Sequence, residues 1–225
     1  MDRLRATTCL FVLALAASPA GAAGGVFEVD TSASTLAVHT QKAGVLSAIS
    51  HNHRFTPDQW QGAAQLDPAR PDALQVRIVV EARSLHDHEE RLGAESRARV
   101  DAEAAGPKVL DVKHYPEIRF EAGPGATVRP GPDRQLEGVL HGSLTLHGAT
   151  RPIDVPFQAR PDGAAYRASG VVRFKQTTFG MTPYTAAMGT IGVDDEVLIQ
   201  FDLVLRPAAG SGPPASFSRA PGGGG

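Results

Sequence analysis

Hydrophobic and polar residues alternate along several short stretches of the chain. In residues 74–82, Leu74, Val76, Ile78, Val80 and Ala82 fall on one face, and mostly polar residues occupy the other. Successive residues of a β-strand point to opposite faces, so this two-residue period is typical of a half-buried strand. The segment therefore predicts a strand with one face in a hydrophobic core.

The same alternation returns in four later segments, most of them separated by turns rich in Gly and Pro. Their apolar faces consist of Ile118 and Phe120; of Leu140, Leu144 and Leu146; of Ile153, Val155 and Phe157; and of Val197, Ile199, Phe201, Leu203 and Leu205. Several short strands joined by such turns favour an antiparallel sheet that closes into a barrel or sandwich.

One segment has no strand alternation. Residues 89–105 are rich in Ala, Glu and Arg, and Gly106-Pro107 follows. This pattern predicts a helix inserted between a strand ending near residue 85 and one starting near residue 117. The predicted fold class is all-β: one domain, an antiparallel barrel of about eight strands with one helical insertion. About eight strands leave an interior that side chains fill or that a small ligand occupies.

The first residues have the pattern of a secretory signal peptide. Arg3 and Arg5 precede an apolar run at 9–17, and Ala20-Gly21-Ala22 offers a cleavage site. A retained membrane anchor is the competing interpretation, but this run is shorter than the ~20 residues that a spanning helix needs. We expect a signal peptide at 1–23, a barrel domain at 24–206, a disordered Pro/Gly-rich tail at 207–225, and a periplasmic or secreted protein.

The composition excludes several classes of partner and chemistry. The chain has 22 basic and 24 acidic residues without a basic stripe, which argues against a nucleic-acid partner. Its single cysteine, Cys9, lies in the predicted signal peptide, so the mature protein has no disulfide and no thiol chemistry. None of the common catalytic or phosphate-binding motifs is present. We therefore expect a binding protein and not an enzyme.

Four segments together resemble a known family. They are "VFEVDTSASTLAVHT" (26–40), "VLDVKHYPEIRFEA" (109–122), "LEGVLHGSLTLHGATRPIDVPF" (136–157) and "GVDDEVLIQFDLVL" (192–205). In order and spacing they resemble the YceI-like proteins over residues 26–206. One segment departs from the commonest members: "VLSAISHNHRFTPDQWQG" (45–62) stands where those carry a Gly-x-Phe-like run, and it is similar to a His-x-His subgroup.

The resemblance implies a lipocalin-like barrel with a long hydrophobic lumen. Family members are described as binding polyisoprenoid lipids or isoprenoid quinones, are often periplasmic, have no established catalysis, and are sometimes associated with membrane cytochromes. We therefore expect an isoprenoid lipid or quinone as ligand, a membrane cytochrome as one candidate partner, and leave the oligomeric state open, a dimer included. The expected lumen residues are Val76, Ile78, Val80, Phe120, Leu144, Leu146, Phe157, Phe179, Met181, Ile199 and Phe201.

Two His-x-His pairs offer a different chemistry. On a strand, residues two apart share a face, so His51 with His53, or His86 with His88, could reach one metal ion. If the pairs met, four imidazoles would suit zinc, copper or nickel, and the alternative function is a metal-binding or redox-accessory protein. A polar rim without metal and ordinary polar residues are the other interpretations. We expect all four to lie near one barrel end, outside the lumen, because unpaired buried imidazoles are costly.

Two further expectations concern the C-terminal half. The segment "FGMTPYTAAMG" (179–189) forms either an adaptable apolar loop over one end of the barrel or a plain hydrophobic plug. Asp194, Asp195 and Glu196 are expected in a solvated hairpin turn. Trp60 is the sole tryptophan and is expected either to anchor the core or to contact a ligand at the mouth of the lumen.

Overall fold

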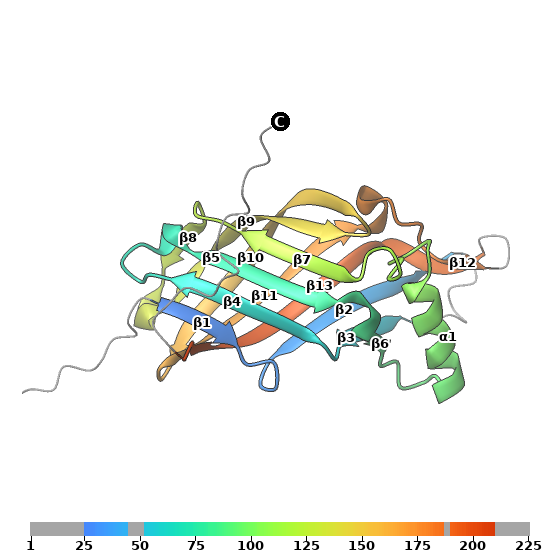
Figure 1. The fold of residues 1–225 in the computed structure, drawn as a ribbon, viewed down its shortest axis with the longest axis horizontal. Coiled ribbons are helices and arrows are strands. Elements are labelled where there is room, and N and C mark those ends of the chain that lie inside the picture. The colour runs from blue at the N-terminus through green and yellow to red at the C-terminus, as the bar shows by residue number, and fades with distance from the viewer. Residues whose placement is uncertain (1–24, 45–51, 187–189, 210–225) are drawn as a thin grey trace, which may run out of the picture.

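The protein is an elongated antiparallel β-barrel in a computed structural model that describes residues 25–44, 52–186 and 190–209 (Figure 1). The predicted signal peptide and residues 210–225 of the predicted tail lie outside these ranges. Neighbouring strands pair all the way around, because β13 pairs with both β11 and β1. The barrel strands in spatial order are β1 (Gly25–Val29), β4 (Trp60–Leu66), β5 (Gln75–Glu81), β7 (Glu117–Ala122), β9 (Leu136–Leu146), β10 (Ala149–Asp162), β11 (Ala165–Lys175) and β13 (Ile191–Pro207). The predicted eight-stranded barrel is confirmed.

Three strands extend one end of this barrel. They are β2 (Thr35–Ala43), β3 (His53–Pro57) and β6 (Leu85–Asp87), and they pair in the order β13-β2-β3-β6. They continue β1, β4 and β5 after short interruptions in the chain, so three of the barrel strands are bent. The remaining short elements are β8 (Thr127–Pro130), β12 (Thr185–Ala186), η2 (Pro71–Ala73), η3 (Ala82–Ser84), η4 (Pro132–Arg134) and η5 (Gln176–Phe179).

The strand register turns the alternating pattern into a core. Directly paired residues of antiparallel strands have their side chains on the same face. Phe120 of β7 pairs with Leu144 of β9, and Val172 of β11 pairs with Ile199 of β13. Each apolar face read from the sequence therefore meets another apolar face inside the barrel.

The helical insertion is shorter than predicted. Helix α1 (Ala94–Ala105) begins after Gly93, which has an extended backbone, and residues 89–93 form a turn instead. The guanidinium of Arg97 donates to the carbonyls of Glu89 and Leu92, which holds that turn against the helix. The helix ends before Gly106, as the sequence predicts. In Figure 1 it lies at one end of the barrel beside β6 and β3.

The link between β1 and β2 is held by one carboxylate. Asp30 accepts hydrogen bonds from the hydroxyl of Ser32 and from the backbone N–H groups of Ser32 and Ala33, and Arg206 of β13 donates to it as well. The Ser32 hydroxyl hydrogen bond, followed by that from Arg206, lowers the pKa of Asp30 to about 2.

One sequence expectation at a strand end is wrong. Asp194, Asp195 and Glu196 lie inside strand β13 at a register shift and not in a hairpin turn, and Asp195 accepts hydrogen bonds from Thr177. His147 occupies the tight β9–β10 turn with φ 50° and is followed by Gly148 at φ 73°. Among the described residues, no helix is long and apolar enough to cross a bilayer.

Candidate functional site

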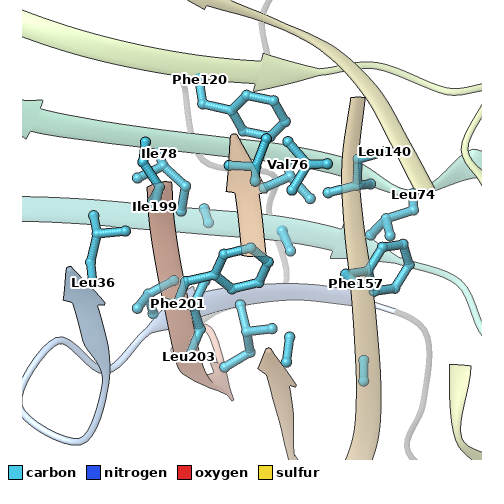
Figure 2. A pocket seen from close by; sticks show the side chains of 18 of the residues that line it. Leu36, Leu74, Val76, Ile78, Phe120, Leu140, Phe157, Ile199, Phe201 and Leu203 are labelled. Carbon is cyan, nitrogen blue, oxygen red and sulfur yellow. The ribbon is translucent and has the colours of Figure 1, made fainter. Parts of the chain in front are cut away.

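The barrel encloses an apolar cavity of about 170 Å³, which we call the lumen. All eight barrel strands contribute side chains to it, and β2 adds Leu36. Figure 2 shows Val76, Ile78, Phe120 and Phe201 directed into this common space, with only carbon atoms among the side chains drawn. Among the lining side chains only those of Trp60 and Tyr166 carry a polar atom, so the lumen offers almost entirely apolar contacts.

Inward-facing glycines make room for the aromatic rings of the lumen. A Cβ at Gly142 would lie 2.7 Å from the Phe120 ring and 2.6 Å from the Glu121 carbonyl oxygen. A Cβ at Gly170 would lie 2.5 Å from the ring of Phe201. Both distances are shorter than real Cβ contacts, so these positions have no space for a side chain while the rings keep their places.

Most of the expected lumen residues line the cavity. They are Val76, Ile78, Val80, Phe120, Leu144, Phe157, Ile199 and Phe201. Leu146, Phe179 and Met181 are not among the lining side chains; with Leu144 they form a second buried cluster that also packs Val109, Leu110 and Ile118. Trp60 lines the lumen as well, so the ligand-contact interpretation of this residue agrees with its position.

Several lining residues were absent from the expected set. Leu140, Val155, Leu203 and Leu205 share the alternating faces seen in the sequence, and that signal alone would have found them. Phe27, Leu36 and Tyr166 also line the cavity, but they lie in segments with weaker alternation, and only the strand pairing shows which way they point.

His53, His86 and His88 lie at the barrel end next to α1, and none of these three lines the lumen. His53 Nδ1 lies 2.9 Å from Oδ2 of Asp87, whose side chain is fully buried. His86 Nδ1 lies 3.1 Å from Oδ2 of Asp101 in α1. His51 falls outside the described residues.

The pairing of β3 with β6 separates these histidines. Phe55 pairs with Asp87 and Thr56 pairs with His86, so His53 shares a face with Asp87 while His86 points to the opposite face. Within residues 25–44, 52–186 and 190–209, no three His, Asp, Glu or Cys side chains gather closely enough to hold a metal ion. The structure does not bring His53 and His86 to one point.

The outer surface carries ion pairs. Arg167 donates to both carboxylate oxygens of Asp202, and these hydrogen bonds lower the pKa of Asp202 and raise that of Arg167. His141 is hydrogen-bonded to Asp154, whereas Nε2 of His39 has no partner among the described residues. Burial, with the nearby positive charge of Arg54, lowers the pKa of His39.

Comparison with known proteins assigns the chain to a family. The model of the YceI-like domain matches residues 27–205, which is nearly the whole barrel. The chain belongs to the YceI-like family. This match confirms the family resemblance seen in four sequence segments.

Individual relatives agree with this assignment. A UPF0312 protein of Pseudomonas savastanoi is 27% identical over 142 residues, covering 60% of this chain and 67% of the relative. A UPF0312 protein of Pseudomonas putida is 29% identical over 147 residues, covering 61% of this chain and 68% of the relative.

Two solved structures show the same fold. BcnA of Burkholderia cenocepacia is similar with a TM-score of 0.60 and 21% identity, covering 78% of this chain and 98% of that chain. A polyisoprenoid-binding domain of Saccharophagus degradans, implicated in plant cell wall breakdown, gives a TM-score of 0.57 and 13% identity, covering 81% of this chain and 98% of that chain. At these identities the similarity establishes the fold alone.

Proposed function

We propose that this YceI-like barrel binds an isoprenoid chain, as part of a polyprenyl lipid or an isoprenoid quinone, in its lumen. The observation that carries the proposal is the enclosed apolar cavity, lined from all eight strands by aliphatic and aromatic side chains. The fold similarity to a domain named for polyisoprenoid binding supports the same class of ligand.

The chemistry of the lumen matches such a ligand. Transfer of an apolar chain out of water is favourable by ~0.8 kcal/mol per CH₂. A polar head group inside the lumen would lose its hydrogen bonds to water, at a cost of ~1–3 kcal/mol for each group that finds no new partner. The lumen therefore takes the tail, and the head group of the lipid lies beyond the lumen.

The leader sequence supports a setting for this activity. Arg3, Arg5 and the apolar run at 9–17 have the pattern of a signal peptide. We propose that the protein carries its lipid in the periplasm or outside the cell, where a long isoprenoid would otherwise be insoluble. A membrane cytochrome as a candidate partner of the protein stays a prediction.

A binding titration tests the proposal. The sole tryptophan, Trp60, lines the lumen, so its fluorescence should respond when a tail enters. Delipidated protein is titrated with isoprenoid alcohols of two to five isoprene units. We expect affinity to rise with length until the lumen is filled, because each added unit buries more apolar surface. Absence of any saturable fluorescence change for every length would refute lipid binding in the lumen.

A further inference from the structure

A polar hollow of about 780 Å³ lies at the α1 end of the molecule, and we call it the basic hollow. Its charged lining residues are Lys42, Arg54, Arg91, Arg97, Glu89 and Glu90, and none of them lines the lumen. Four Lys or Arg against two Glu leave a formal charge of +2 in the hollow, although the whole chain carries −2. The cations come from three segments of the chain, so only the folded protein brings them together.

The basic hollow opens on the outer surface of the barrel. Arg54 stands between His53 and Phe55 on β3, and neighbouring residues of a strand point to opposite faces. Phe55 is buried, whereas Arg54 is exposed. The hollow is therefore not a continuation of the barrel interior, and a group bound in it meets the protein from outside.

The positive charges of Lys42 and Arg54 are not neutralised by neighbouring acids. Neither side chain forms an ion pair with a described residue, in contrast to Arg91, whose Nε lies 3.9 Å from Oε1 of Glu89. The guanidinium of Arg97 donates to two backbone carbonyls of the turn before α1. A carbonyl oxygen holds this guanidinium in place but has no full negative charge to cancel it.

The surroundings of Arg54 show the same excess of positive charge. Arg54 pairs directly with His39 of β2, so the two side chains are neighbours on the outer face. Burial, together with the positive charge of Arg54, lowers the pKa of His39. On the other side of Arg54, the backbone N–H of His88 donates to the Arg54 carbonyl, and His88 also lines the hollow. Like charges on adjacent strands are unfavourable, so a bound anion would stabilise this row.

Phosphate groups match the side chains of the basic hollow. A guanidinium donates two parallel hydrogen bonds to phosphate oxygens, and a Lys ammonium binds phosphate as a point charge. The cations are spread over β2, β3 and the start of α1, so one phosphate does not satisfy all of them. The surface of an anionic bilayer presents many phosphates side by side, and clustered Lys and Arg bind such surfaces.

We propose that the basic hollow is a docking surface for the phosphate groups of an anionic phospholipid bilayer. These phosphates belong to lipids that stay in the bilayer, and not to the molecule in the lumen. Docking turns the α1 end of the barrel toward the membrane. The inference goes beyond the proposed function, and it is measured without any ligand in the lumen.

The test is cosedimentation with vesicles of two compositions. Protein purified from its native host is mixed with vesicles of phosphatidylcholine alone, or of phosphatidylcholine with about one third phosphatidylglycerol. We expect the protein to sediment with the anionic vesicles and to stay in solution with the neutral ones. Raising the salt from about 0.05 M to about 0.5 M should weaken the binding at least about tenfold, because salt screens the attraction.

Single charge removals assign this binding to the basic hollow. Lys42→Gln and Arg54→Gln should each weaken binding to anionic vesicles about fivefold, which corresponds to about 1 kcal/mol for each cation. The matched control is Arg129→Gln, since Arg129 of β8 is exposed and Figure 1 shows β8 at the end of the barrel opposite α1. The control should change the affinity by less than about twofold. Thermal unfolding of each variant should match that of the wild type.

The outcomes separate docking from lipid binding in the lumen. Equal binding to both kinds of vesicle, or an equal loss in Arg54→Gln and Arg129→Gln, would overturn the proposal. Binding of inorganic phosphate that depends on Arg54, without binding to the vesicles, would overturn it in favour of a site for a soluble phosphate compound. In solution, Arg54→Gln should keep the wild-type affinity for an isoprenoid alcohol measured by Trp60 fluorescence, so failure of docking leaves the proposed function standing.

Discussion

Filling the lumen from one wall should weaken lipid binding strongly without unfolding the protein. Ala168 of β11 is 9% exposed, lines the lumen, and pairs with Leu203 and Ala159, which line it too. Ala168→Leu adds three carbons to this cavity of about 170 Å³. The space that the new side chain takes is no longer open to part of the isoprenoid.

The expected loss follows from the apolar transfer free energy. One isoprene unit has five carbons, so excluding one unit forfeits about 4 kcal/mol at ~0.8 kcal/mol per carbon. Because a shorter part of the tail is ordered on binding, the smaller entropy cost offsets part of this loss in binding free energy. We expect Kd for a four-unit isoprenoid alcohol to rise by about a hundredfold to a thousandfold.

The assay is the Trp60 fluorescence titration with thermal unfolding in parallel. The free energy of unfolding should change by less than about 2 kcal/mol, because the added carbons enter existing space. The matched control is Ser169→Leu, one residue further along on the exposed face, which should bind like wild type. A folded Ala168→Leu protein whose Kd rises less than about threefold would refute the assignment of the tail to the lumen.

Three further predictions concern stability. Thr40→Val should raise the free energy of unfolding by about 1 kcal/mol in chemical denaturation, because it removes a buried hydroxyl without a partner among the described residues; a decrease would contradict this. Gly142→Ala should lower it by about 1–3 kcal/mol through overpacking, whereas Gly123→Ala, with open space at its Cβ, should have little effect; equal effects would contradict the contact argument. The pKa of Asp30 is lowered from 3.8 to about 2, so its carboxylate contributes stability that is present above pH 3.8 and is lost as pH falls through about 2. The loss of stability with falling pH, monitored by circular dichroism, should therefore be shallower in that window for Asp30→Asn. An unchanged profile would rule this contribution out.

The barrel and most of the lumen could be predicted because alternation reports directly on which face is buried. Val76, Ile78 and Val80 follow a two-residue period, and the structure places all three on the lumen. The same argument extends to Ile199 and Phe201. In these strands the apolar face predicted from the alternation is the face that the barrel buries, because strand pairing places the apolar faces side by side.

Apolar residues outside a strand were harder to place. Phe179 and Met181 were expected in the lumen, but Phe179 ends the 3-10 turn η5, Met181 follows it, and both pack in the second cluster. The rings of Phe179 and Phe174 meet edge to face with centroids 5.2 Å apart. A turn has no period from which a buried face can be read, so its side-chain directions depend on the elements that surround it.

The interruptions of the strands also depend on tertiary hydrogen bonds. Ser84 Oγ accepts a hydrogen bond from the backbone N–H of Gln59 and donates to the carbonyl of Glu81, which fixes the bend between β5 and β6. This bend aligns Asp87 with His53. In the sequence, Asp87 is the residue between two histidines. Its position as the buried hydrogen-bond partner of His53 depends on the pairing of β3 with β6, which the sequence does not show.

The most direct test of the central claim is the identity of the lipid that the protein carries. Protein purified from its native source under mild conditions is extracted with organic solvent, and the extract is analysed by mass spectrometry beside that of Ala168→Leu. We predict one isoprenoid molecule per wild-type chain and a strong depletion of it in the variant. Recovery of no isoprenoid from the wild type, or of equal amounts from both proteins, would contradict an isoprenoid tail bound in the lumen.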